Sequence, residues 1–317
     1  MIDNSDKTNF EPELHPTISP ITAAVTGLIG VFILYQFVGG LLTILIFGMD
    51  FQNADMNAVR LMTMGGQILF ILFPALLLSK MVYEDVTTVI RFRYPSKEQI
   101  IVFSIGMIIL IPLLQNYLYI QNYFIEQIAR NNQFVNHLKQ LIDKLDKLVE
   151  QTYGNMLKAD SFIDALLIVV VVAITPAICE EIFFRGFVQK SFEQKLKPYW
   201  SALMTAIFFG LYHFNPYGLI PLVALGFYLG WSAYTTNSIF VPMILHFINN
   251  FTAVTAYFMF GEEDLIESNV VPKEGISESV IIFILLLILF AGLVFYIKKK
   301  YPPSKNNKRS DYDLSEM

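Results

Sequence analysis

Residues 165–186 read ALLIVVVVAITPAICEEIFFRG, and this stretch decides the class of fold. Residues 165–179 carry no charged side chain, and two glutamates and an arginine follow at once. A helix that crosses the hydrocarbon core of a membrane needs about 20 mostly apolar residues. The whole chain of 317 residues is 55% hydrophobic and 15% charged, whereas soluble domains carry about 25% charged residues. The sequence therefore predicts a polytopic membrane protein.

Apolar stretches of the same kind recur along the chain. They predict an all-α fold, a membrane helix bundle with about eight transmembrane helices. The fifth stretch is short, and we find no internal repeat. The predicted spans are 21–49, 61–79, 101–123, 165–179 with its continuation, 199–213, 217–236, 239–261 and 279–297.

The spans also predict how the chain is organised. In chain order we expect a cytoplasmic N-terminal tail (1–20), three accessory transmembrane helices (21–123), an extracytoplasmic amphipathic segment (124–160), a core of four helices (161–261), a last transmembrane helix (279–297) and a cytoplasmic tail, first basic and then acidic (298–317).

The distribution of lysine and arginine predicts the orientation, because these residues are enriched in short cytoplasmic loops. Residues 80–98, 185–197 and 298–309 are rich in lysine and arginine, whereas 262–278 is rich in acids. We therefore expect a multi-pass protein of the plasma membrane with both termini in the cytoplasm and residues 124–160 outside.

Residues 124–160 are predicted to contain an amphipathic helix that lies on the membrane or on the spans. Both a packed extracellular helix and a substrate gate are compatible with the pattern. Its apolar residues recur every three or four positions, with lysines between them: Phe134, Leu138, Leu141, Leu145 and Leu148, against Lys139, Lys144 and Lys147.

Charge and cysteine content exclude several classes of function. The formal net charge of −5 argues against nucleic acid as a partner, because binding to phosphates needs a basic surface. Cys179 is the one cysteine, so the sequence excludes an intramolecular disulfide and a cysteine-based metal cluster. We expect Cys179 to be a small packing residue.

Ionisable residues within the predicted spans are candidates for function, since a charge in the bilayer core costs about 2.5–3.5 kcal/mol on insertion scales. They are Glu180, Glu181, Arg185, His213 and His246. At 1.5 Å per residue, Glu180 lies roughly 15 Å, His213 roughly 20 Å and His246 roughly 10 Å from the expected cytoplasmic edge. These groups fall in one central slab, so we expect them to converge.

The spacing of these residues suggests pairings. Glu181 and Arg185 are four residues apart on one helix face and are predicted to pair, while Glu180 points about 100° away, toward a cavity. His246 and Asn250 also share a face. Each feature has a plainer structural interpretation: a solvated ion pair, a histidine that only packs, and an asparagine that joins helices.

Three ordered motifs resemble the type II CAAX prenyl protease and bacteriocin-processing (CPBP, or Abi) family of intramembrane proteases. The motifs are Glu180-Glu181-Ile182-Phe183-Phe184-Arg185, Phe209 to His213, and His246 to Asn250. The resemblance covers about 160–261 and implies that residues 161–261 are the catalytic core of an intramembrane endopeptidase.

The resemblance and the chemistry of peptide hydrolysis suggest roles for the site residues. Glu180 would activate a water together with His213, and His246 and Asn250 would stabilise the oxyanion. Glu181 and Arg185 would hold the helix in place. A metalloprotease reading remains open, in which Glu180, His213 and His246 would hold Zn²⁺ and Glu181 would be the base. The sequence leaves the cofactor unknown.

The substrate class implied by the resemblance is a membrane-bound peptide or protein, either prenylated or small and bacteriocin-like, with the lipid bilayer as the surroundings. Two other functions compete with this one. In a proton-coupled transporter the same acids and histidines would form a relay. An inactive immunity or scaffold protein would keep the motifs without the activity.

Overall fold

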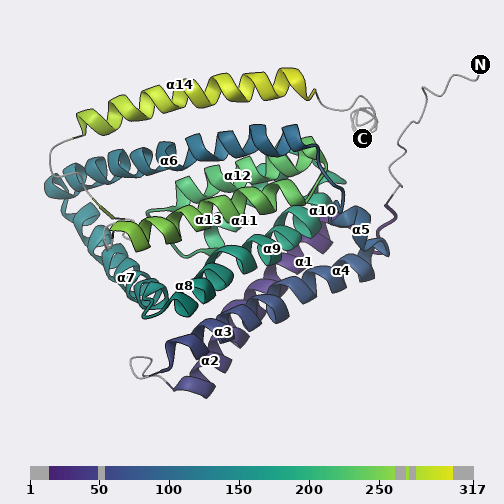
Figure 1. The fold of residues 1–317 in the computed structure, drawn as a ribbon, viewed down its shortest axis with the longest axis horizontal. Helices are drawn as coiled ribbons and strands as arrows, with labels where there is room; N and C mark the ends of the chain where they lie inside the picture. Colours follow the sequence, from purple (N-terminus) through teal and green to yellow (C-terminus); the bar gives the residue numbers. More distant parts are fainter. Residues whose placement is uncertain (1–13, 49–53, 261–268, 271–275, 303–317) are drawn as a thin grey trace, which may run out of the picture.

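The structure is a computed structural model that describes residues 14–48, 54–260, 269–270 and 276–302 (Figure 1). Every regular element in these ranges is a helix, which confirms the predicted all-α fold. Most of the two terminal tails predicted from the sequence, 1–13 and 303–317, lies outside the described residues, as does most of the loop 262–278.

Seven helices in the described residues are long and apolar enough to cross a membrane, which confirms a multi-pass bundle close to the predicted eight spans. They are Pro20–Phe47, Met56–Tyr83, Lys97–Asn131, Phe162–Glu193, Leu219–Thr236, Phe240–Phe260 and Ser277–Lys300.

Three of the spans combine α-helix with wider π-helical turns. The first is α1 (Pro20–Phe32), the turn Ile33–Gly39 and α2 (Gly40–Phe47). The second is α3 (Met56–Gln67), the turn Ile68–Leu72 and α4 (Phe73–Tyr83), followed by the short α5 (Val86–Val89). The fourth is α8 (Phe162–Ile168), the turn Val169–Ile174, α9 (Thr175–Glu181), the turn Ile182–Val188 and α10 (Gln189–Glu193).

The remaining helices are unbroken. They are α6 (Lys97–Asn131), α7 (Gln133–Leu157), α11 (Pro198–Tyr212), α12 (Leu219–Thr236), α13 (Phe240–Phe260) and α14 (Ser277–Lys300).

The predicted fifth span is α11, which has 15 residues. At 1.5 Å per residue it rises only about 22 Å, less than the roughly 30 Å of the hydrocarbon core. It forms a close hairpin with α12 through the turn that begins at His213.

Two π-helical turns stand directly before a proline in the first turn of the next α-helix. Pro74 follows the turn Ile68–Leu72, and Pro176 follows Val169–Ile174. Proline has no amide hydrogen, so the carbonyl four residues earlier loses its usual partner. Local π-helical adjustment and neighbouring side chains satisfy such carbonyls inside a membrane.

The third span continues beyond the predicted end at residue 123. α6 runs to Asn131, and α7 begins at Gln133 after a break at Asn132, whose side chain accepts a hydrogen bond from the amide of Val135. Figure 1 shows α7 running across the end of the bundle at which α6 ends and α8 begins.

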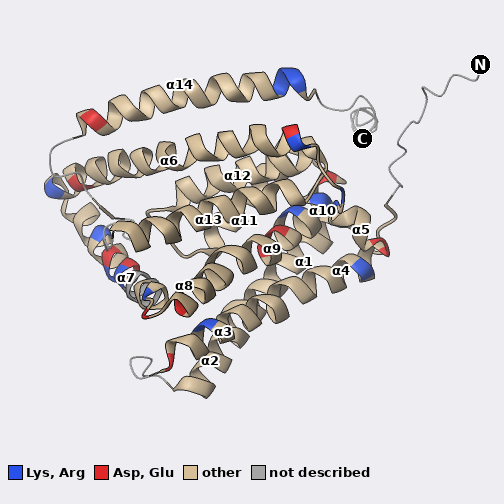
Figure 2. Cartoon of the chain, viewed as in Figure 1, with Lys and Arg blue, Asp and Glu red and all other residues tan. Residues whose placement is uncertain are grey.

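The fourth span occupies the centre of the bundle. It contacts α1 and α4 on one side and α11, α12 and α13 on the other (Figure 1). Its phenylalanines Phe183, Phe184 and Phe187 are fully buried in the hydrophobic core. Figure 2 shows charged residues at the ends of the bundle and along α7, with a further group on α9 and α10. The charges on α9 and α10 therefore lie inside the protein.

Candidate active site

A buried cluster of three ionisable side chains lies at the end of α9. The Arg185 guanidinium donates from Nη1 to Glu181 Oε1 at 2.7 Å, and both side chains are fully buried. His246 of α13 places its Nδ1 2.7 Å from the same oxygen. Because an ionised carboxylate only accepts hydrogen bonds, His246 donates from Nδ1 in this arrangement. The structure thus brings together three of the predicted site residues.

Glu180 lies about 100° around the helix from Glu181 and forms no hydrogen bond to this cluster in the part of the chain that the structure describes. The residue is half-buried, and its Oε2 atom is buried without a hydrogen-bond partner among the described residues. A buried carboxylate oxygen is costly to leave unpaired. Glu181 Oε2 is likewise buried without a partner among the described residues, so the two acids differ in exposure and in the ion pair. Because Glu180 is only half-buried, it is the more accessible acid of the pair.

His213 is fixed by its own helix. It ends α11, and its Nδ1 lies 2.7 Å from the carbonyl oxygen of Phe209. A carbonyl only accepts, so Nδ1 carries the hydrogen and Nε2 keeps its lone pair. His213 can therefore accept a hydrogen bond from a water. No hydrogen bond joins His213 to Glu180 in the part of the chain that the structure describes.

The Phe209 ring connects the two histidines. Its centroid lies 4.6 Å from that of His213 and 5.9 Å from that of His246, and the Arg185 guanidinium carbon lies 4.5 Å from it. Phe209 is the first residue of the second motif, but its role as the common contact could not be read from that motif. The close approach of Gly226, where an added Cβ would lie 3.0 Å from the ring, keeps Phe209 in this position.

Asn250 lies one turn beyond His246 on α13 and bonds to the main chain of the fourth span. Its amide nitrogen donates to the carbonyl of Val172 at 3.0 Å, and its side-chain oxygen accepts from Asn249. Val172 is the carbonyl four residues before Pro176, the one that the proline leaves without its usual partner. Asn250 therefore joins two helices, as the plainer interpretation expected, and keeps a second amide hydrogen for other use.

Hydrogen bonds extend from the cluster along one face of the fourth span. Glu181, Arg185, Gln189 and Glu193 follow one another at intervals of four residues. Arg185 Nη2 donates to the Gly226 carbonyl at 3.1 Å, and Gln189 Nε2 donates to the Gly230 carbonyl at 2.9 Å. Gln189 Nε2 also donates to Glu193, 2.9 Å away.

Arg91 completes this network from the segment after α5. It is buried, donates from Nη1 to the Arg185 carbonyl at 2.7 Å, and pairs through Nη2 with Glu193. The sequence indicated Arg91 only as a charge of a cytoplasmic loop. The four-residue spacing of Gln189 and Glu193 after Arg185 was the available signal for the rest of the network.

One of the three comparisons with known proteins gave a match. Residues 162–252 match the family model described as Rce1-like, type II CAAX prenyl endopeptidase. Residues 162–252 form an Rce1-like segment. The searches of curated proteins and of solved structures gave no match. The segment contains all three motifs, so the predicted resemblance is confirmed, and it supports an intramembrane endopeptidase of the CAAX type as the general class.

The geometry of the Rce1-like segment does not support the metalloprotease reading. The described residues contain no group of three or more histidine, cysteine, aspartate or glutamate side chains placed to hold a metal ion. The bonds from Nδ1 of His246 to Glu181 and from Nδ1 of His213 to a carbonyl would themselves be compatible with metal binding through Nε2. The expected zinc set of Glu180, His213 and His246 is nevertheless not gathered into a metal site among the described residues.

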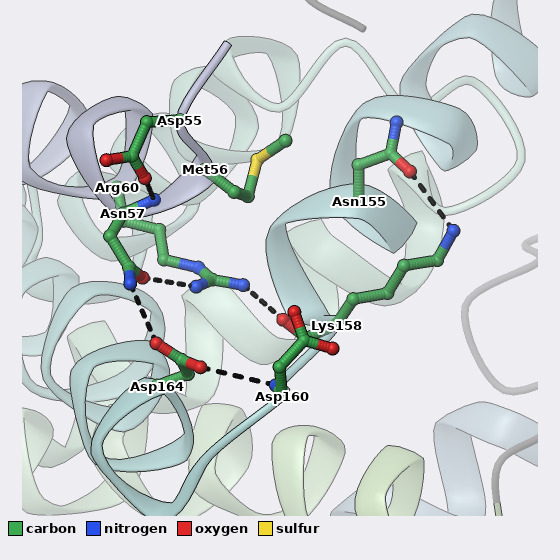
Figure 3. A pocket seen from close by; sticks show the side chains of 8 residues that line it. All are labelled: Asp55, Met56, Asn57, Arg60, Asn155, Lys158, Asp160 and Asp164. Atoms are coloured by element: carbon green, nitrogen blue, oxygen red, sulfur yellow. Dashed lines mark hydrogen bonds between the residues drawn. The ribbon is translucent and has the colours of Figure 1, made fainter. Parts of the chain in front are cut away.

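A polar pocket of about 280 Å³ lies between α3 and the α7–α8 connection, where Asp164, near the start of the Rce1-like segment, lines it (Figure 3). Arg60 donates to the carbonyls of Met156 and Lys158 and to the Asn57 side chain, which in turn bonds to Asp164. Asp164 precedes Glu181 by roughly 25 Å of helix at 1.5 Å per residue. The residues of the pocket therefore join α3 to the α7–α8 connection and are separate from the cluster at Glu181.

Proposed function

We propose that this chain is an intramembrane endopeptidase that hydrolyses a peptide bond in a membrane-associated peptide or protein. The observation that supports this most is the difference in environment between two adjacent acids. Glu181 is fully buried and its Oε1 is bonded to Arg185 and His246, whereas Glu180 is only half-buried and forms no ion pair among the described residues. Each acid also has a buried Oε2 atom without a hydrogen-bond partner in the described part of the chain. This arrangement lies within the segment that matches the endopeptidase family.

Glu180 acts in this proposal as the general base. It takes a proton from a water as the water oxygen attacks the carbonyl carbon of the substrate. The same carboxyl group then gives the proton to the amide nitrogen as the carbon–nitrogen bond breaks. His213 accepts a hydrogen bond from the attacking water through its Nε2 lone pair, which the bond from Nδ1 to Phe209 leaves available.

His246 and Asn250 stabilise the oxyanion of the tetrahedral intermediate. In this proposal both ring nitrogens of His246 carry a hydrogen, so that Nδ1 donates to Glu181 and Nε2 donates to the oxyanion. Asn250 donates its second amide hydrogen, because the first is bonded to Val172. Arg185 is a positioning residue, since it reaches the reaction only through Glu181 and Phe209.

For the orientation, we propose that the ends of α4, α10 and α14 face the cytoplasm of the cell and that the protein lies in the plasma membrane. The lysines and arginines near these ends support this arrangement. Both termini would then be cytoplasmic.

The test is an activity assay with the full-length protein in vesicles and a library of membrane peptides, read by mass spectrometry. Glu180→Gln keeps the shape of the side chain but removes the base, so cleavage should fall about 100-fold or more while the protein stays folded. The control is Glu278→Gln at the exposed start of α14. Equal cleavage by Glu180→Gln and wild type would exclude Glu180 as the base, and proton-driven transport without cleavage would favour the transporter.

A further inference from the structure

Helix α7 presents three different sides to its surroundings. One side faces the bundle and is made of Val135, Lys139, Ile142, Asp143 and Asp146, the less exposed residues of the helix. At 100° per residue, the apolar residues Phe134, Leu138, Leu141 and Leu145 lie about 115° to one side of it. Gln140, Lys144 and Lys147 lie about 125° to the other side.

The side toward the bundle is held by polar bonds and not by leucines. Tyr217 donates to Asp143 at 2.5 Å, and Lys139 bonds to Asp143 at 2.8 Å and lies 3.6 Å from Glu126 of α6. Burial lowers the pKa of Lys139, but Asp143 and Glu126 raise it more, so the net pKa lies above its ordinary value and the lysine stays charged. Asp146, also on this side, is only 2% exposed.

The described residues of the protein leave the apolar side of α7 uncovered. Phe134, Leu138, Leu141 and Leu145 are 70%, 44%, 59% and 57% exposed. A continuous row of exposed large apolar side chains marks an interaction surface, because exposing that much apolar surface to water is unfavourable.

The helices on either side of α7 indicate what covers this row. Ile128 near the end of α6 is 53% exposed, and Phe162 and Ile163 at the start of α8 are 82% and 75% exposed. Both helices are candidate membrane spans, and exposed apolar side chains on such spans are expected to face lipid. Helix α7, which carries the row, lies between them in sequence and runs across the same end of the bundle (Figure 1).

We propose that α7 lies in the membrane surface at this end of the bundle, with Phe134, Leu138, Leu141 and Leu145 inserted among lipid acyl chains. Its opposite side, with Lys144 and Lys147, faces water and the lipid head groups, as in other interfacial helices. Because Tyr217 follows His213 in the turn after α11, α7 is also attached to the part of the chain that carries a proposed site residue. The proposal is independent of any proteolytic activity.

Spin labels on single cysteines test the position of the helix. The full chain with Cys179→Ala, at a buried position, is the background, in vesicles of phosphatidylethanolamine and phosphatidylglycerol. Labels at Leu138→Cys and Leu141→Cys should collide more with oxygen than with a water-soluble nickel chelate. Labels at Gln140→Cys and Lys144→Cys, the matched controls, should show the reverse order.

Two results would overturn the proposal. Strong collision with the nickel chelate at all four positions would mean that the apolar row is in water. Weak collision with both reagents at Leu138→Cys and Leu141→Cys would mean that protein, such as a second copy, covers it. A second readout is tryptophan fluorescence: brominated lipids should quench Leu141→Trp more than Lys144→Trp, and equal quenching would again contradict the proposal.

Discussion

Replacing Arg185 with alanine should destabilise the protein severely. The guanidinium is fully buried, bonds to Glu181 and to the Gly226 carbonyl, and lies over the Phe209 ring. Removing it leaves the equally buried Glu181 carboxylate with His246 alone. Breaking a buried ion pair by removing one partner costs about 3–5 kcal/mol, because the remaining charge is uncompensated. We expect a loss of this size in the free energy of unfolding of Arg185→Ala.

The chain contains a matched control for this experiment. Glu126 and Arg130 of α6 have the same spacing of four residues, but the Arg130 side chain is 65% exposed. An exposed ion pair contributes less than about 1 kcal/mol, so Arg130→Ala should unfold almost as the wild type does. The measurement is denaturant-induced unfolding in detergent micelles, followed by circular dichroism.

A second variant separates the ion pair from general damage to the core. Glu181→Gln combined with Arg185→Gln removes both charges and should lose less stability than Arg185→Ala alone, since no unpaired charge stays behind. The reasoning would be refuted if Arg185→Ala were no less stable than Arg130→Ala, because the pair would then behave as a surface feature.

Three other changes test separate parts of the structure. Asn250→Ala should lower the free energy of unfolding by about 1–3 kcal/mol, because it leaves the Val172 carbonyl unpaired. Cleavage should also fall about 100- to 1000-fold if Asn250 stabilises the oxyanion. Unfolding and cleavage assays measure the two effects, and unchanged stability would contradict the structural role. Gly226→Ala should cost about 1–3 kcal/mol, because its Cβ would approach the Phe209 ring to 3.0 Å; unfolding indistinguishable from wild type would show that the ring moves freely. A cysteine in place of Lys195 should react with an impermeant maleimide only after cells are opened, and labelling of intact cells would reverse the proposed orientation.

The membrane fold could be predicted from the sequence because long apolar stretches have few alternatives. The helices in the structure follow the predicted spans closely, including the short α11, although α6 is longer than predicted. The pairing of Glu181 with Arg185 could also be predicted, because a spacing of four residues places both on one helix face. Local periodicity was sufficient for these features.

Contacts between distant parts of the chain could not be predicted in this way. Arg91 and Glu193 meet only through the tertiary fold, and no spacing rule connects them. The bond from Asn250 to Val172 likewise depends on how α13 lies against the fourth span. For α7, the sequence indicated an amphipathic helix but left open which side would contact the protein. In the structure the side that carries the charged residue Asp143 makes this contact.

The bonds from the fourth span to α12 have a consequence for the alignment of these two helices. Arg185 and Gln189, four residues apart, meet the carbonyls of Gly226 and Gly230, also four apart. A slip of one turn, about 5.4 Å, would bring Gln189 to Gly226 and leave Arg185 facing the side chain of Leu222. Only one alignment of the two helices satisfies both donors. This alignment therefore fixes the depth of Glu180 and Glu181 in the bundle relative to the histidines.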